Sequence, residues 1–225
     1  MFEWNGFAFI GLMCFLMSSV SAILTLFAKR HGEALLWGLI CLLLSVWSFI
    51  SLLCFSAKTP EDALFYAHAL NNVIIFLPPL LFHFCVTFIE KVDNYKRVVV
   101  LYYSLSIAYS AVVIAFSEYF LHSPTLRFEI FWFPYAGVLF YIFPMLYLLV
   151  VGHAVQILVS ARSSQGQAQK RKTNYLLTTI FMGMLGAGSS IAVVVDVSLP
   201  SYGIFSVAFV VLFATYALMR HDLLR

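Results

Sequence analysis

Polar side chains that could do chemistry gather in one otherwise apolar stretch, residues 63–89. The stretch carries Tyr66, His68, Asn71, Asn72, Pro78, Pro79 and His83. At about 100° per residue, one helical face holds His68, Asn72, Ile75, Pro79 and His83, with Asn71 beside them. An unpaired amide or imidazole against lipid costs several kcal/mol, so we expect this face to point inward, towards other polar groups or a wet cavity.

The two prolines of this stretch provide a second feature that could help to bind a ligand. Neither Pro78 nor Pro79 has an N–H group, so the carbonyls of Ile74 and Ile75 lose their helical donors and the helix bends. A bend with free carbonyls is a place where a ligand pocket can form. Polar residues inside a membrane usually have a function, which supports this interpretation. The alternative is that these side chains only join helices, at roughly 0.6 kcal/mol per hydrogen bond.

Further candidate wall residues for such a pocket are Tyr109, Tyr141 and His153. We expect no catalytic residue, no metal and no cofactor. The four cysteines have no metal-ligand spacing. The apolar stretches contain neither paired aspartates nor a nucleophile with a partnered histidine, as a protease would need. They also contain no lysine that could bind retinal. The sequence therefore indicates binding rather than catalysis.

The stretch with the polar face is one of several that could cross a bilayer. The chain has 225 residues, 63% of them hydrophobic and 10% charged, with a mean hydropathy of +0.96. Apolar stretches of about 20 residues, enough to span a membrane as a helix, cover residues 7–27, 34–55, 63–89, 98–117, 134–159, 174–195 and 202–219. We predict an all-α integral membrane protein, a seven-transmembrane helix bundle that forms a single domain over residues 1–225.

The basic residues indicate how this bundle is oriented. Alternate connections and the C-terminus carry Lys29, Arg30, Lys91, Lys96, Arg97, Arg162, Lys170, Arg171, Lys172, Arg220 and Arg225, whereas Lys58 and Arg127 lie opposite. By the positive-inside rule the N-terminus is outside and the C-terminus is cytoplasmic. The net charge of +3 then reflects contact with anionic inner-leaflet lipids, and we expect no binding of nucleic acid.

Two connections are longer than the rest. Residues 160–173 are small, polar and basic, which favours a loop that anchors on lipid, with partner docking as the alternative. Residues 118–132 are rich in aromatics and alternate apolar and polar residues from Leu126 to Ile130. Alternation predicts an extended segment across the outer mouth of the bundle. It could be a lid, although we favour an interfacial aromatic belt that includes Tyr119, Phe120, Phe128, Phe131, Trp132 and Phe133.

Small residues mark the sixth stretch. Gly183, Gly186, Ala187, Gly188, Ser189 and Ser190 follow one another closely. Small residues let membrane helices approach each other, so we expect tight helix packing here.

Several short motifs resemble one protein family. The seventh stretch begins with the sequence PSYG at residues 200–203 and ends with ATYALMRHDLLR at residues 214–225, the third contains LPPLLFHF at residues 77–84, and QKRK at residues 169–172 precedes the sixth. These motifs and the topology are similar to the N-terminal seven-helix sensor region of bacterial histidine kinases. The resemblance implies a multi-pass protein of the bacterial inner membrane that is not itself an enzyme and whose cytoplasmic output, a kinase or a cyclase, follows residue 225. It also implies that the protein could form a homodimer.

The mechanism that this resemblance implies is a population shift. A small lipophilic or membrane-derived signal would favour one arrangement of the bundle, and the last helix would carry the change to the output. Two other functions stay open: a small-molecule transporter or permease, and a non-catalytic membrane scaffold.

Overall fold

The computed structural model describes residues 6–27, 32–127, 130–195 and 203–220. Its elements are α1 (Gly6–Leu26), α2 (Gly32–Phe55), α3 (Pro60–Ile74), α4 (Leu77–Phe88), α5 (Val92–Ala115), α6 (Ser117–Phe120), β1 (Thr125–Arg127), β2 (Phe131–Phe133), the 3₁₀ helix η1 (Val138–Tyr141), α7 (Ile142–Arg162), α8 (Gln167–Val194) and α9 (Gly203–Arg220). Residues 200–202 and 221–225 of the sequence motifs lie outside the described residues.

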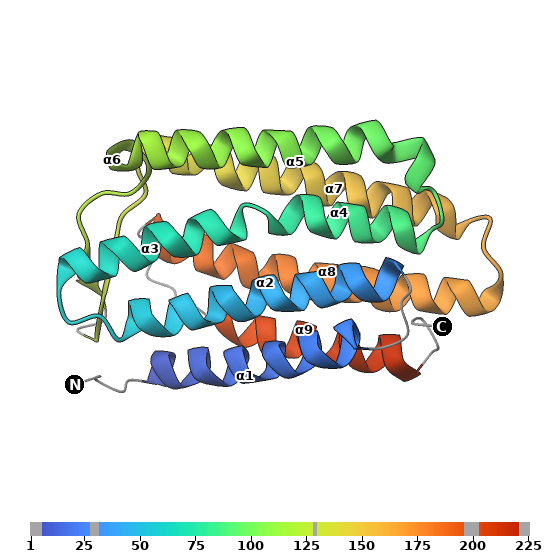
Figure 1. The fold of residues 1–225 in the computed structure, drawn as a ribbon, viewed down its shortest axis with the longest axis horizontal. Coiled ribbons are helices and arrows are strands. Elements are labelled where there is room, and N and C mark those ends of the chain that lie inside the picture. Colours follow the sequence, from blue (N-terminus) through green and yellow to red (C-terminus); the bar gives the residue numbers. More distant parts are fainter. Residues whose placement is uncertain (1–5, 28–31, 128–129, 196–202, 221–225) are drawn as a thin grey trace.

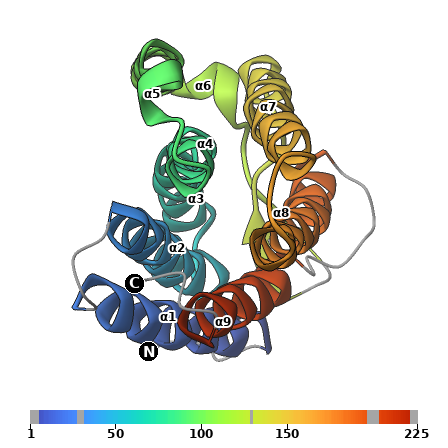
Figure 2. The same ribbon diagram turned by 90° about the vertical axis from the view of Figure 1, so that its right-hand side faces the viewer.

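The long helices run side by side along one axis and alternate in direction (Figure 1). Seen along that axis, α2, the α3–α4 pair, α7, α8 and α9 are arranged around a centre (Figure 2). Helix α1 packs outside α2 and α9, and α5 packs outside α4. The predicted all-helical membrane bundle is therefore confirmed.

Length and composition identify the helices that can cross a membrane. Among the described residues, five segments qualify: Gly6–Leu26, Gly32–Phe55, Pro60–Phe88, Val92–Ala115 and Val138–Arg162. Helices α8 and α9 coincide with the sixth and seventh predicted stretches, and α9 contains the shorter apolar segment Ser206–Thr215. Large apolar side chains, such as Ile23, Ile107 and Met145, are exposed on the outer faces of the bundle, as contact with lipid tails requires.

Three predicted boundaries are wrong. Helix α5 begins at Val92 instead of residue 98, and α8 begins at Gln167 instead of residue 174. Both helices start with turns that carry charged residues, because a helix can extend beyond the membrane into water while its apolar part stays within it. The predicted loop at residues 160–173 is consequently short, since α7 continues to Arg162. Helix α7 in turn starts later than residue 134, after η1.

The third predicted span is two helices. Helix α3 ends at Ile74 and α4 begins at Leu77, with Pro78 in its first turn. The predicted bend is thus a break, at the place where the prolines remove two donors. The hydroxyl of Ser106 on α5 donates to the freed carbonyl of Ile75 at 3.2 Å. A neighbouring helix therefore supplies the hydrogen bond that the helix itself cannot make.

The connection between α6 and α7 contains two short strands where an extended segment is predicted. Strands β1 and β2 form an antiparallel hairpin in which Leu126 pairs with Trp132. Phe131 is buried, and its ring centroid lies 4.9 Å from that of Phe55 on α2. The aromatic-belt interpretation is wrong for Phe120, Phe131 and Phe133, which are all buried. Tyr119 is exposed, so its place in an aromatic belt stays a prediction, and Phe128 lies outside the described residues.

One glycine makes the connection at this end possible. Gly137 lies so close to the backbone of Tyr119 that a Cβ atom there would overlap the Tyr119 carbonyl. Its N–H group donates to the carbonyl of Phe120 at 2.8 Å. The end of α6 is thereby joined to the residue that precedes η1.

Charge is divided between the two ends of the bundle. The ends of α4 and α7 and the starts of α5 and α8 meet at one end (Figure 1), which carries Lys91, Lys96, Arg97, Arg162, Lys170, Arg171 and Lys172. Lys58 lies at the other end, between α2 and α3. The basic residues that the positive-inside rule assigns to one side of the membrane thus lie at one end of the bundle.

Candidate ligand-binding site

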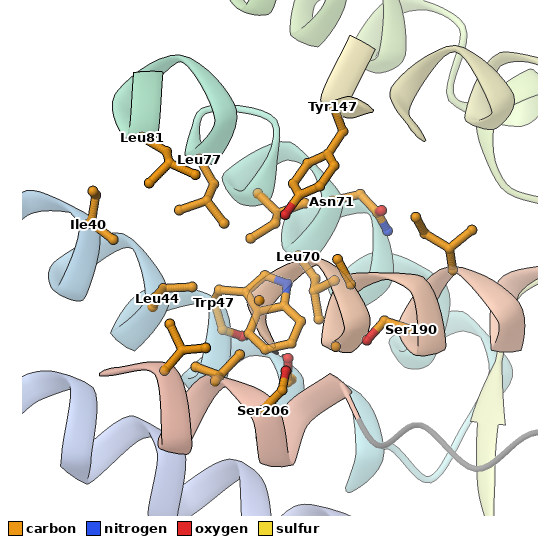
Figure 3. Close-up of a pocket in the computed structure, with 18 of the residues that line it drawn as sticks. Ile40, Leu44, Trp47, Leu70, Asn71, Leu77, Leu81, Tyr147, Ser190 and Ser206 are labelled. Atoms are coloured by element: carbon orange, nitrogen blue, oxygen red, sulfur yellow. Dashed lines mark hydrogen bonds between the residues drawn. The ribbon is translucent and has the colours of Figure 1, made fainter. Parts of the chain in front are cut away.

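A cavity of about 160 Å³ lies at the centre of the bundle. Helices α2, α3, α4, α7, α8 and α9 all contribute to its wall, and Phe133 of β2 and Phe140 of η1 add to it at the hairpin end. Figure 3 shows how side chains from these elements converge. The cavity is therefore a product of the whole fold and not of one helix.

The cavity is long and narrow. On α2 its lining runs from Trp37 to Phe55, about 27 Å of helix at a rise of about 1.5 Å per residue. On α8 it runs over a similar length, from Leu176 to Val194. Its volume of about 160 Å³ is close to that of a cavity which holds one benzene molecule. This volume is spread along most of the length of the helices.

The lining changes character along its length. Ile40, Leu44, Leu77 and Leu81 form an apolar part, and Asn71, Ser190 and Ser206 lie in another part (Figure 3). The polar groups lie towards the end with the hairpin, because Ser190 is near the end of α8 and Ser206 is near the start of α9. The cavity thus has a more polar half near the hairpin and an apolar half near the basic end of the bundle, which the positive-inside rule predicts to be its outer and inner halves.

Trp47 lies between the apolar and the polar part of the cavity lining (Figure 3). Only 9% of this residue is exposed, and its indole nitrogen is buried without a hydrogen-bond partner among the described residues. Figure 3 shows its ring among the lining side chains, with the nitrogen on the side of Leu70 and Asn71. A buried donor without an acceptor costs about 1–3 kcal/mol, so this N–H group marks a place where an acceptor is favoured.

Small residues on α8 leave room for the cavity. Gly183, Gly186, Ala187 and Ser190 all line it, and their spacing of three and four residues puts them on one helical face. A Cβ atom on Gly183 would lie 3.9 Å from a methyl group of Val210 on α9. The tight packing expected for this stretch is present between α8 and α9, and part of the same face opens onto the cavity.

Asn71 is the sequence-predicted candidate that lies in this lining. Its side chain is buried, and its amide nitrogen donates to the carbonyl of Ala67 at 2.8 Å within α3. Within the described part of the chain, the other candidates do not line the cavity. Their role in ligand binding stays a prediction.

Asn72 and His68 face the other side of α3. The hydroxyl of Ser110 on α5 donates to the side-chain oxygen of Asn72 at 2.8 Å, and the Asn72 amide nitrogen donates to the carbonyl of His68 at 3.0 Å. The His68 ring lies 6.1 Å from that of Phe120, with its Nδ1 atom buried and without a partner among the described residues. The predicted polar face thus meets polar groups of α5, while the next face along, that of Asn71, meets the cavity.

The remaining candidates of this span lie apart. Tyr66 is half-buried with its ring against Phe65, Pro79 is buried at the start of α4, and the His83 ring lies 6.1 Å from that of Tyr103 on α5. The structure does not bring these three residues together into one site.

The candidates from later spans are also dispersed. The Tyr109 hydroxyl donates to the carbonyl of Leu139 at 2.8 Å, which ties α5 to η1. His153 on α7 shares a 2.7 Å hydrogen bond with the Tyr102 hydroxyl on α5. Tyr141 is 52% exposed, on the outside of the bundle. These contacts join helices around the cavity without reaching it.

Sequence reasoning missed most of the lining, in particular Trp47, Tyr147 and Thr179. Each is a single residue of ordinary type in an apolar helix, and no spacing sets it apart. The signal that could have found the wall was the run of small residues from Gly183 to Ser190, whose periodicity of three and four predicts a face with space beside it.

The last helix is joined to the base of the cavity. Val207 and Val210 of α9 line it, and so does Trp37 of α2. The indole nitrogen of Trp37 donates to the hydroxyl of Thr215 on α9 at 3.1 Å. Both side chains are buried. The wall of the cavity and the final turns of α9 thus share a hydrogen bond.

Comparison with known proteins identifies the family of this chain. The family model described as the N-terminal 7TM region of histidine kinase matches residues 10–225. No curated protein and no solved structure matches the chain. Since the match covers nearly the whole chain, and the structure is a membrane helix bundle of the expected kind, this protein belongs to the N-terminal seven-transmembrane sensor regions of histidine kinases.

Proposed function

We propose that this sensor region detects a small lipophilic molecule in its central cavity and relays its presence through α9 to a cytoplasmic kinase output. The protein acts in the bacterial inner membrane, with seven spans, its N-terminus outside and its C-terminus in the cytoplasm. The cavity itself is the observation that carries this proposal: a narrow, largely apolar space within the membrane part of a sensor, with the last helix in its wall.

The connection of α9 supports the relay. A molecule that binds better to one arrangement of the bundle shifts the population towards that arrangement. Because Ser206, Val207 and Val210 line the cavity, a ligand contacts α9 directly. A change in the position of α9 also changes the contact between Trp37 and Thr215, close to the end of the helix.

The distribution of charge supports the orientation. Seven basic residues of the described chain, Lys91, Lys96, Arg97, Arg162, Lys170, Arg171 and Lys172, share the end at which α9 finishes. Positive charge is retained on the cytoplasmic side of a membrane, where it also meets anionic lipid. This end therefore faces the kinase output.

The binding step can be tested with a variant that fills the cavity. Gly183→Leu adds a side chain between α8 and α9 at the wall, whereas Gly188→Leu adds the same side chain where a Cβ atom meets no other group within 4 Å. A lipophilic extract of the bacterial culture should raise the unfolding temperature of the reconstituted protein and of Gly188→Leu. Gly183→Leu should show no rise. An equal rise in both variants, or none in the unaltered protein, would rule out ligand binding in the cavity.

A further inference from the structure

We infer that the ligand of the cavity is an uncharged, single-chain amphiphile whose head carries a hydrogen-bond acceptor for the indole N–H group of Trp47. This inference rests on the proposed function, since it names the chemical class that the same cavity takes. It depends on three features of the lining: its lack of charge, its unpaired donor and its shape.

The first feature is charge. Every described side chain in the lining is apolar, a hydroxyl, an amide or an indole, and none is a lysine, arginine, histidine, aspartate or glutamate. A carboxylate or phosphate moved from water to this interior would lose its hydration without gaining a counter-charge. The head of the ligand is therefore neutral.

The second feature is the donor. Trp47 offers an N–H group that is buried and without a partner among the described residues. The other indole of the lining differs, because Trp37 already donates to Thr215. An indole nitrogen can only donate, so the matching group on the ligand is an oxygen that accepts: a carbonyl, an ester or an ether.

The third feature is the shape together with its polarity. A space of about 160 Å³ that follows about 27 Å of helix suits a flexible single chain better than a bulky group. Ile40, Leu44, Leu77 and Leu81 line the part away from the hairpin, where an alkyl chain is favoured. The head then lies beside Trp47, Asn71 and Ser190, in the outer half.

The experiment compares three probes of equal chain length, short enough for a cavity of about 160 Å³: heptan-2-one, heptane and heptanoate. Binding to the protein in phosphatidylcholine nanodiscs is measured by competition with a brominated alkane that quenches tryptophan fluorescence. We expect the ketone to bind about three- to tenfold more tightly than the alkane, the gain from one neutral hydrogen bond, and the carboxylate to bind most weakly.

The variants assign that gain to one residue. Trp47→Phe keeps an aromatic ring but removes the N–H group, so ketone and alkane should bind it equally. Trp132→Phe, in β2 and outside the cavity lining, should keep the preference of the unaltered protein. If Trp47→Phe does not fold, the proton spectrum of ¹⁵N-indole-labelled protein replaces it: the ketone should shift one indole N–H signal downfield, and heptane should not.

The outcomes separate the two proposals. Equal binding of ketone and alkane to the unaltered protein, or a preference that survives in Trp47→Phe, overturns the inference on the head group and leaves a lipophile-binding cavity intact. Tightest binding of the carboxylate also overturns it. Failure of all three probes to bind, together with no stabilisation by lipophilic extract, contradicts the proposed function itself.

Discussion

The hydroxyl of Ser110 on α5 donates to the side chain of Asn72 on α3 at 2.8 Å, while Asn71, its neighbour in sequence, faces the cavity. Two adjacent amides thus lie on neighbouring faces of one helix, about 100° apart. One joins helices, and the other lines the space in which we propose that the signal binds.

Leucine substitutions at these two positions should have separate effects. Asn72→Leu removes the bond to Ser110 and should lower the free energy of unfolding by about 0.6–1.7 kcal/mol, the range of interhelical hydrogen bonds in membranes. Asn71→Leu loses only a bond within its own helix and should change lipophile affinity with little effect on stability. Unfolding in mixed micelles and binding in nanodiscs measure the two quantities. The reverse assignment would contradict the orientation of α3.

The contact between Trp37 and Thr215 predicts a second substitution effect. Thr215→Val keeps the shape of the side chain but leaves the Trp37 N–H group buried without an acceptor, so stability should fall by about 1 kcal/mol. The basal activity of the attached kinase should change as well, because the bond joins the cavity wall to α9. Thr25→Val is the control, since the Thr25 hydroxyl, also buried, donates within its own helix, to the carbonyls of Ser21 and Ala22. Equal effects of both variants on kinase activity would refute a specific role for the contact.

The break between α3 and α4 predicts coupling between a serine and a proline. Ser106→Ala removes the donor to the Ile75 carbonyl and should cost about 1 kcal/mol. In a Pro79→Ala background the cost should be smaller by about 0.5 kcal/mol or more, because residue 79 then has its own N–H group for that carbonyl. A double-mutant cycle of unfolding free energies gives the coupling. Ser104→Ala, an exposed serine of the same helix, should have little effect in either background.

Labelling tests the orientation in the membrane. Lys58→Cys and Arg162→Cys place thiols at exposed positions on opposite ends, whereas the four native cysteines are buried. A maleimide that cannot cross membranes should label Lys58→Cys in intact cells and Arg162→Cys only after lysis. Labelling in the opposite order would show that the bundle is inverted.

Much of the fold could be predicted from local features. Long apolar stretches, the two prolines of α4 and the alternation around Leu126 predicted the helices, a bend in the third span and an extended segment, because each depends on neighbouring residues in the chain. That the bend is a break and that the extended segment belongs to a hairpin was not predicted. The extended ends of α5 and α8 were missed, since apolar length indicates the membrane and says nothing about helix that continues into water. The aromatic side chains of the hairpin were misplaced because burial of Phe131 depends on Phe55, which is distant in sequence.

The site was harder to predict for a physical reason. The polar residues of the third span are conspicuous in sequence, yet Asn72 faces α5 and Asn71 faces the cavity, a difference of one position. The cavity is formed by isolated residues such as Trp47 and Tyr147 from six long helices, and its existence depends on how those helices pack. The small residues of α8 were interpreted as a packing face, although they also leave space at the cavity wall.

The most direct measurement is autophosphorylation of the histidine kinase that carries this region, in nanodiscs with and without the lipophilic signal. We expect the signal to change the rate in the unaltered kinase and in Gly188→Leu, and to leave Gly183→Leu, with its filled cavity, at one fixed rate. A Gly183→Leu kinase that responds like the unaltered one would show that the signal acts elsewhere and that the central cavity is not the sensor.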